Sequence, residues 1–158
     1  MERITISLED ELLAELDTYM GRKGYANRSE ALRDVLRAEL EEDRLSTGRA
    51  THCVACLTYI YNHEERELSQ RLVRAQHDHH YLGLSTLHVH LDHENCMEAV
   101  ILRGATAKVR DFSNEVIAQR GVRHGNLHMV PADLAIERHA HGHHAGRQAP
   151  HLHSRPKT

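Results

Sequence analysis

The pattern of apolar and polar residues at the start of the chain predicts one strand followed by two helices. Residues 3–8 alternate polar and apolar side chains, as a half-buried β-strand does. Apolar residues then recur at helical spacing over residues 12–20, and the glycines that follow end this helix. A second helix begins near Asn27, where Asn27 and Glu30 have the spacing of a capping box, and its apolar stripe runs through residues 31–40.

This first region, residues 1–45, is near the lower size limit for burying an adequate core by itself. Its lone strand would also leave both edges unpaired. Both problems disappear if two chains pair their strands and interlock their helices, so we expect an obligate dimer here. The paired ribbon would present Arg3, Thr5 and Ser7 twice on one face, and these side-chain types suit the edges of bases. A plain solvated strand face is the alternative, and alternation alone does not separate the two.

After a break at residues 46–51, which we interpret as a linker, a second pattern predicts a small α/β domain over residues 52–131. The expected order is β-α-β-β-α-β, the ferredoxin-like split βαβ arrangement. Such a domain has one sheet with helices on one face, which leaves the other face to pack on a partner. The fold class is therefore α+β. The expected elements are strands at 53–61, 82–91, 96–103 and 122–130, with helices at 64–76 and 105–120.

Composition narrows the setting in which such a chain works. The formal net charge is −3, so any DNA binding must rest on a local basic patch rather than on a global cationic field. No apolar run approaches the roughly 20 residues that cross a bilayer, and the chain opens without a signal-peptide core. We therefore expect a cytoplasmic protein with no membrane partner. Three cysteines are an odd number, which argues against structural disulfides in a reducing compartment.

The histidines are distributed unevenly: none lies in residues 1–51, ten lie in 52–130, and six lie beyond residue 131. The last six are interspersed with Pro, Gly and Ala in residues 132–158. Such a composition does not build a core, so we expect a disordered tail that binds metal loosely.

The densest cluster of metal-binding side chains lies in residues 87–96. On a strand, His88 and His90 share one face, and a polar turn can bring Cys96 beside them. Two imidazoles and one thiol predict a transition-metal site. A closed four-coordinate site needs one more ligand, for which His77 is the nearest candidate in character. Nitrogen-rich tetragonal sites suit Ni(II) or Cu(II) and tetrahedral ones suit zinc, and the residues alone leave zinc nearly as good an interpretation.

Other Cys, His and Glu residues receive smaller roles. Cys53 and Cys56 stand three apart on a predicted strand and should face opposite ways, with Cys56 in the core and Cys53 incidental. Glu98 has the strand parity to support the metal ligands. We interpret His79, His80 and His93 as solvated turn residues, with support of the ligands or a weaker second site as the alternatives. We expect packing or surface roles for His63, His124 and His128.

Several motifs carry a resemblance to known families. Residues 1–45 resemble the ribbon-helix-helix transcription factors, in which the N-terminus of the second helix faces the DNA backbone; this implies phosphate contacts from Asn27, Arg28 and Ser29. A helix N-terminus does offer free amides to phosphate. Most of the chain further resembles the nickel-responsive regulator family NikR, in the motifs His77, His88-Val-His90, Cys96, Arg28-Ser-Glu-Ala, Tyr59-Ile-Tyr61 and residues 118–125.

That second resemblance implies a ribbon-helix-helix domain joined to an ACT-like, ferredoxin-like metal-binding domain. It also implies one square-planar Ni(II) per subunit, held by His88, His90 and Cys96 of one subunit and His77 of another. The implied assembly is a homotetramer, a dimer of dimers, that represses by binding a palindromic operator in double-stranded DNA. In this family a monovalent cation is associated with carboxylates on the second helix, a pattern that Glu30 and Asp34 match; an exposed acidic pair is the alternative.

Three rival functions remain open from the sequence. A metal storage or delivery protein would explain the histidines but leaves the first region without a purpose. A ribbon-helix-helix antitoxin would not explain the metal-binding cluster. A copper or cobalt sensor could share the same build. We expect no enzyme, since the sequence offers no oriented nucleophile–base pair and the expected metal site has no open position.

Overall fold

The structure is a computed structural model that describes residues 4–65, 67–138 and 150–157. The chain divides into two compact units, Met1–Glu42 and Asp43–Thr158. Among the helices of the described residues, none is both long enough and apolar enough to cross a membrane.

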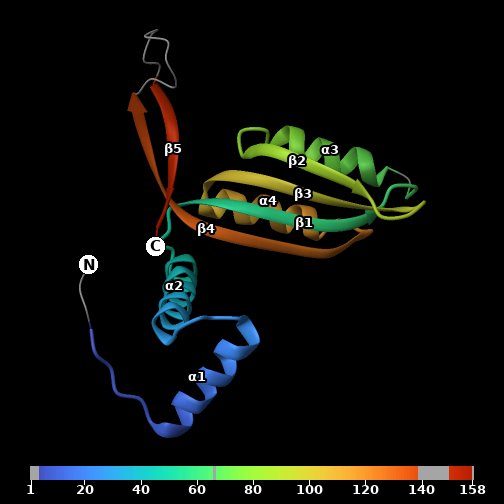
Figure 1. Ribbon diagram of the computed structural model, residues 1–158. Coiled ribbons are helices and arrows are strands. Elements are labelled where there is room, and N and C mark those ends of the chain that lie inside the picture. The colour runs from blue at the N-terminus through green and yellow to red at the C-terminus, as the bar shows by residue number, and fades with distance from the viewer. Residues whose placement is uncertain (1–3, 66, 139–149, 158) are drawn as a thin grey trace, which may run out of the picture. The chain divides into compact units, whose positions relative to one another are not determined.

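The first unit contains the two helices that the sequence predicts. Helix α1 spans Asp10–Lys23 and ends at Gly24, whose φ of 77° is the left-handed conformation that glycine adopts without strain. Helix α2 spans Arg28–Ser46 (Figure 1). The Oδ1 atom of Asn27 accepts a hydrogen bond of 2.9 Å from the backbone N–H of Glu30. This confirms the predicted cap at the start of the second helix.

The strand predicted over residues 3–8 is not formed in the single chain. Residues 4–9 have no regular secondary structure, and Arg3 lies outside the described residues. Ile4 is 78% exposed and Ile6 55% exposed. A β-strand satisfies its N–H and C=O groups only by pairing, and the predicted partner is the same strand of a second chain. The strand therefore stays a prediction about the paired dimer, which a single chain does not test.

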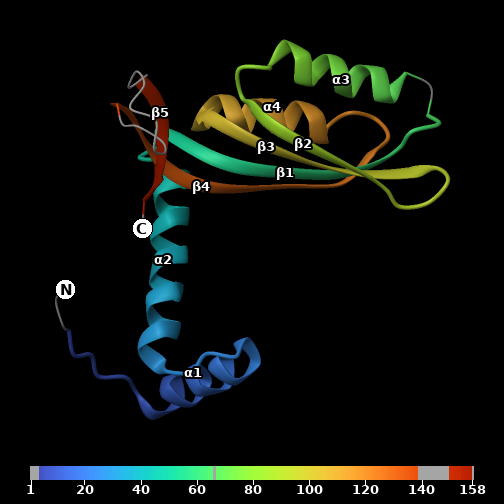
Figure 2. The ribbon, with the colours of Figure 1, turned by 45° about the horizontal axis from the view of Figure 1, so that its top comes forward.

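The second unit is an antiparallel sheet with two helices on one face (Figures 1 and 2). The strand order is β2-β3-β1-β4-β5, and its first four strands have the predicted ferredoxin-like arrangement. The helix predicted from residue 64 begins later, at Leu68. The elements are β1 His52–Asn62, α3 Leu68–Asp78, β2 Gly83–His90, β3 Asn95–Ala105, α4 Thr106–Ile117, β4 Val122–Arg138 and β5 Pro150–Pro156.

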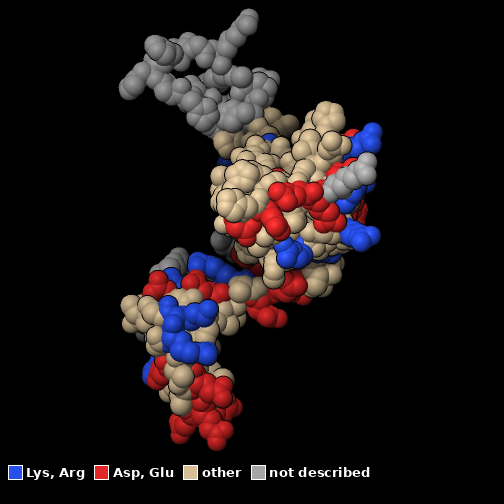
Figure 3. All heavy atoms as spheres, turned by 90° about the vertical axis from the view of Figure 1, so that its right-hand side faces the viewer, with Lys and Arg blue, Asp and Glu red and all other residues tan. Residues whose placement is uncertain are grey.

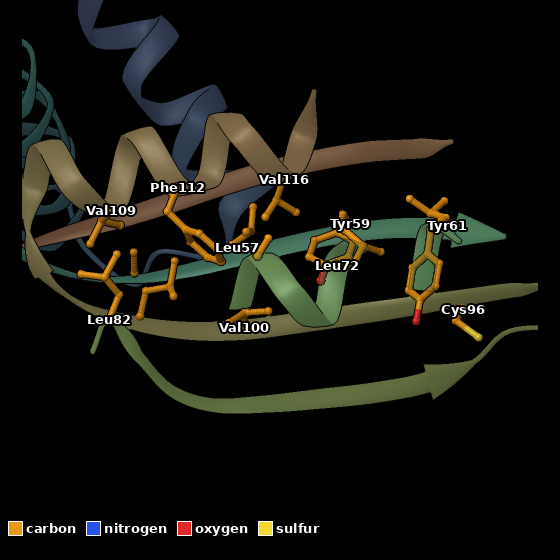
Figure 4. Packing of buried hydrophobic residues seen from close by; sticks show 14 of the residues in the cluster. Leu57, Tyr59, Tyr61, Leu72, Leu82, Cys96, Val100, Val109, Phe112 and Val116 are labelled. Carbon is orange, nitrogen blue, oxygen red and sulfur yellow. The ribbon is translucent and has the colours of Figure 1, made fainter. Parts of the chain in front are cut away.

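The core lies between the sheet and its two helices. Strand β1 alternates buried and half-buried residues along its whole length, so one of its faces is fully covered. Leu57 and Tyr59 of that face pack with Leu72 of α3 and with Phe112 and Val116 of α4 (Figure 4). Cys96 of β3, one of the predicted metal ligands, belongs to this cluster.

The two cysteines of β1 face opposite ways, as predicted, but their roles are exchanged. Cys53 is completely buried in the core cluster, and Cys56 is half-buried on the other face of the sheet. The assignment of Cys56 to the core was therefore wrong. Residues 53–57 of β1 are apolar on both faces of the strand, so the sequence pattern does not reveal which face the helices cover.

The predicted disordered tail is ordered in two segments. Strand β4 continues past the predicted domain boundary at residue 131, and β5 pairs with it antiparallel from Ala132↔Pro156 to Arg138↔Pro150. Lys157 Nζ lies 2.8 Å from Asp133 Oδ1. The prediction of disorder is wrong for these two segments, because pairing of the two strands satisfies their backbone N–H and C=O groups without a core. Residues 139–149, with four of the tail histidines, lie outside the described residues.

Candidate metal centre

The hairpin between β2 and β3 has the geometry that the sequence predicted. Its turn is held by Asp92, whose Oδ1 accepts hydrogen bonds from the backbone N–H groups of Glu94 at 2.8 Å and Asn95 at 2.7 Å. The side-chain amide of Asn95 also donates to both carboxylate oxygens, at 3.0 and 2.9 Å. These contacts, the Asn95 side chain first, lower the pKa of Asp92. The turn is thus closed by a charged acceptor that stays ionised at neutral pH.

This turn sets the register that brings the metal-binding side chains together. His90 pairs with Cys96 and His88 pairs with Glu98 across the two strands. Directly opposed residues of an antiparallel pair lie on the same face. All four side chains therefore point to the side of the sheet that carries the helices.

Three ligand atoms meet at the end of this hairpin. Cys96 Sγ lies 3.2 Å from His90 Nδ1 and 3.4 Å from His63 Nδ1. Within the described residues, His63, His90 and Cys96 offer ligand atoms that all lie within 4.8 Å of one another. The ring of His88 lies beside that of His90, with centroids 4.9 Å apart. Figure 4 shows Cys96 at the end of the core cluster, near the hydroxyl end of Tyr61.

His88 is oriented by a buried carboxylate. Glu98 is 8% exposed, and its Oε1 atom lies 3.1 Å from His88 Nδ1. When His88 Nδ1–H donates to this oxygen, Nε2 keeps its lone pair for a metal. The prediction that Glu98 supports the ligands therefore agrees with the contacts.

The same carboxylate collects three further donors. Oε1 accepts from the Tyr61 hydroxyl at 3.1 Å, and Oε2 accepts from Gln76 Nε2 at 3.0 Å and from the Tyr59 hydroxyl. Burial first, and the charge of Glu98 second, raise the pKa of Tyr61 to about 12. The pKa of Tyr59 is also raised, by burial and by its hydrogen bond to Glu98. Both phenols therefore remain protonated hydrogen-bond donors to Glu98.

The thiol of Cys96 is disposed to stay protonated in the metal-free chain. Burial raises its pKa, and the negative charges of Glu98 and Asp92 raise it further. The thiolate is the form that binds metal, so a cation must displace the proton.

His77 lies apart from this cluster in the single chain. It is an exposed residue of the last turn of α3, and with Val73 and Arg74 it lines a shallow depression on the outside of that helix. The structure therefore brings together His90 and Cys96, places His88 beside them, and keeps His77 elsewhere. This arrangement is compatible with a fourth ligand from another subunit.

The sequence predicts a packing or surface role for His63, whereas the structure brings it to the ligands. It follows directly after β1, where Tyr61 pairs with Cys96. Its backbone N–H donates to the carbonyl of Glu94 at 2.9 Å, which ties it to the hairpin turn. The register of β1 against β3 would have predicted this neighbour, but the hydrophobic pattern gives parity and not register.

The residues predicted to contact DNA have mixed environments. Thr5 and Ser7 are exposed, as base-reading side chains must be. Arg28 is half exposed, and its guanidinium pairs with both carboxylate oxygens of Asp17 at 2.8 Å. The Ser29 carbonyl accepts from Arg33 Nε at 3.2 Å. Arg28 must therefore exchange or share its acidic partner to reach a phosphate.

Charge is mixed elsewhere in the described chain as well. Figure 3 shows Lys and Arg side chains interspersed with Asp and Glu over the visible face. Of the possible cation pair on α2, Asp34 accepts hydrogen bonds from the Tyr25 hydroxyl at 3.2 Å and from Arg37 at 3.1 Å. Asp34 is thus already neutralised in part by Arg37.

Comparison with known proteins identifies the family of this two-part chain. Residues 2–43 match the family of ribbon-helix-helix proteins described as the copG family, and residues 54–130 match the NikR C-terminal nickel binding domain. A nickel-responsive regulator of Edwardsiella ictaluri is 49% identical over 144 residues, which is 90% of this chain and 99% of that protein. The chain belongs to the nickel-responsive regulator family. A putative nickel-responsive regulator of Bradyrhizobium diazoefficiens is also 49% identical, over 147 residues, with the same shares covered.

Membership of the nickel-responsive regulator family confirms the predicted fold class. It also confirms the prediction that the chain is a transcription regulator rather than an enzyme. The side chains fit the metal after which the matched domain is named. Imidazole suits nickel among the late transition metals, and thiolate is a soft ligand that such ions accept. The buried carboxylate beside His88 adds the orienting acceptor that such ligands need.

Proposed function

We propose that this chain is a nickel-dependent transcriptional repressor that binds a palindromic operator when Ni(II) occupies a site shared between subunits. His88, His90 and Cys96 of one subunit and His77 of another would hold one Ni(II) per subunit in a square plane. Ni(II) supplies the preference for this geometry, and the protein supplies the placement of the ligands. Because its target is operator DNA, we place the protein in the cytoplasm.

The observation that carries this proposal is the separation of His77 from the other three ligands. His90 and Cys96 are already 3.2 Å apart, whereas His77 is exposed on the outer side of α3. An exposed imidazole at a helix end is available to a second chain. A metal that joins it to the hairpin of another subunit would link the two copies.

Assembly into a homotetramer is supported by two unpaired surfaces. Residues 4–9 expose Ile4 and Ile6 and lack a strand partner among the described residues, which favours pairing with a second chain. The sheet face opposite the helices exposes Leu87 and Ile101, at 63% and 36%. Two dimers of the first unit joined through four second units would cover both surfaces.

In this proposal the binding of metal and the binding of DNA are thermodynamically coupled. If nickel raises the affinity for the operator by favouring the subunit arrangement that fits it, the operator must raise the affinity for nickel by the same factor. The coupling free energy between such sites is typically about 1–3 kcal/mol. Thr5 and Ser7, with Arg3, would read bases, and Asn27, Arg28 and Ser29 at the start of α2 would approach phosphates. Nickel would act on the arrangement of these groups rather than touch the DNA.

The deciding experiment measures operator affinity of the full-length protein with and without stoichiometric Ni(II). We expect nickel to tighten binding to a palindromic promoter fragment in wild type and to have no such effect in His77→Ala. His80→Ala, which removes another exposed histidine beyond the same helix, is the matched control and should behave as wild type. Equal affinity with and without nickel in the wild type would refute the proposal.

A further inference from the structure

The C-terminal strand β5 ends against the segment that follows the first unit. The backbone N–H of Lys157 donates to the Pro131 carbonyl at 2.9 Å, and its Nζ lies 2.8 Å from Asp133 Oδ1, so both contacts hold this end on β4. The Lys157 carbonyl accepts a hydrogen bond of 3.3 Å from Arg44 Nη1, in the last turn of α2. Both ribbon views show the C-terminal end beside the segment between α2 and β1 (Figures 1 and 2).

This segment, residues 43–51, is called the joint, and it is a fixed turn rather than a loose linker. The second unit begins at Asp43 and so includes the last turn of α2. Leu45 and Ala50 are both buried, and the Ala50 N–H donates to the Arg44 carbonyl at 2.9 Å. Arg110 Nη2 of α4 donates to the Leu45 carbonyl at 3.3 Å. Helix α4 and strand β5 therefore hold the same turn of α2 through two arginines.

Strand β5 is an addition to the part of the chain that forms the metal-binding domain. The match to the nickel binding domain ends at residue 130, well before β5 begins at Pro150. The core cluster of the described residues contains no member of β5. A two-stranded ribbon also has little stability of its own. The contact with Arg44 at the end of the ribbon therefore helps to keep β5 in place, and β5 in turn holds the joint.

We propose that β5 is a strap across the joint: by holding Arg44, it limits how far the end of α2 moves on the second unit. The regulatory meaning of the strap rests on the proposed function, in which the second unit binds nickel and the first binds the operator. Helix α2 runs through the boundary between the two units. A stiff joint passes a rearrangement of the second unit on to α2, whereas a loose joint absorbs it. The strap would thus increase the coupling between nickel and operator.

The size of the effect follows from the kind of contact. Arg44 is half-buried, and its guanidinium donates to a neutral carbonyl. Because the net contribution of one such hydrogen bond is modest, its loss should change the equilibrium for opening the joint by about three- to tenfold. Nickel affinity in the absence of DNA should not change, because β5 and the strand β2 that carries two proposed ligands lie at opposite edges of the sheet.

Hydrogen exchange of the full-length, metal-free protein tests the strap without reference to DNA. Amides of residues 45–51 should exchange about three- to tenfold faster in Arg44→Ala than in the wild type, because exchange requires the joint to open. Arg37→Ala is the matched control, since Arg37 lies in the same helix and pairs with Asp34 at 3.1 Å. It should match the wild type over these residues. Alanine favours a helix at both positions, so α2 stays formed.

A second variant removes the strap itself by deletion of residues 150–158. The shortened chain should show the same faster exchange as Arg44→Ala. Combining the two changes should add nothing, because both remove one shared contact. An additive effect would mean that Arg44 and β5 act separately, which would contradict the strap. Chelator-competition titration of Ni(II) without DNA should give the wild-type affinity in each variant, which verifies that the second unit is folded.

The regulatory consequence is measured as operator affinity with and without stoichiometric Ni(II). The gain in affinity that nickel produces should be about three- to tenfold smaller in Arg44→Ala and in the shortened chain than in the wild type and Arg37→Ala. The ratio of the two affinities removes any direct contribution of an arginine charge to DNA binding, since that charge acts with and without nickel.

Two outcomes would overturn the proposal. Unchanged exchange of residues 45–51 in both Arg44→Ala and the shortened chain would show that the strap does not hold the joint. Faster exchange with an unchanged nickel-induced gain would refute its role in regulation. If nickel has no effect on operator binding in the wild type, the proposed function fails, whereas the exchange experiment still decides whether β5 holds the joint.

Discussion

Replacing Glu98 with Gln tests the buried hydrogen-bond network that orients His88. The substitution keeps the size of the side chain and removes its charge. Oε1 of Glu98 serves Tyr61 and His88, and Oε2 serves Tyr59 and Gln76. A glutamine amide presents one acceptor oxygen where the carboxylate presents two, so two of these donors would face an NH₂ group.

The magnitude follows from these contacts. Hydrogen bonds to a charged group contribute about 1.5–3 kcal/mol each, and an unsatisfied buried donor costs about 1–3 kcal/mol. A tyrosine hydroxyl can rotate to accept from the new amide, which recovers part of one interaction. We therefore expect a loss of about 2–3 kcal/mol in the free energy of unfolding of the metal-free protein. Nickel affinity should fall by about 10–100-fold, as is typical when the partner of a metal-binding histidine is removed.

The assay is a chelator-competition titration of Ni(II), together with urea denaturation of the metal-free form. Glu94→Gln is the matched control, because it removes the same charge from the exposed turn, where the Glu94 carboxylate accepts a long hydrogen bond of 3.4 Å from Asn62. We expect the control to lie within about twofold of wild type in nickel affinity. If Glu98→Gln also lies within twofold, orientation of His88 by Glu98 does not contribute to metal binding, and the reasoning is wrong.

Three other predictions concern the thiol and the fold. Because burial and nearby carboxylates raise the pKa of Cys96, nickel affinity should increase about tenfold per pH unit between pH 7 and 8 as one proton is released, and a flat profile in buffered nickel titrations would contradict this. Gly24→Ala should lower the free energy of unfolding by about 1 kcal/mol, because Gly24 has a φ of 77° that alanine adopts only with strain. Gly21→Ala inside α1 should raise it by about 0.5–1 kcal/mol, because alanine favours a helix. Equal shifts of the two variants in thermal denaturation would refute the assigned helix end. Phe112→Ala should cost about 3–5 kcal/mol in denaturant unfolding, and a loss below 1 kcal/mol would mean that this ring is not central to the core.

Much of the second unit was predictable because its strands alternate and its helices have clear apolar stripes. The cluster of His88, His90 and Cys96 follows from strand parity and one turn, which are local properties. His63 was not predictable, because its proximity depends on the register of β1 against β3. Hydrogen bonding across the whole sheet sets that register, and two correct strands can still be aligned in several ways.

The other differences have similarly physical origins. The predicted strand at residues 3–8 requires a partner, which one chain does not supply. The tail has few apolar residues, which predicts disorder, but β5 pairs with β4. The backbone N–H of Lys157 also donates to the carbonyl of Pro131 at 2.9 Å. Composition predicts whether a segment can form a core, and it does not predict whether the segment can pair with an existing strand.

Strand β2 lies at the edge of the sheet, and every one of its residues is exposed. It carries two of the proposed nickel ligands on one face and the exposed apolar residues Leu87 and Val89 on the other. An edge strand with apolar side chains and unpaired backbone groups is a template for unwanted pairing with other chains. Metal bridging His90 to Cys96 would lock β2 onto β3, so nickel supply would also govern the tendency of newly made chains to aggregate.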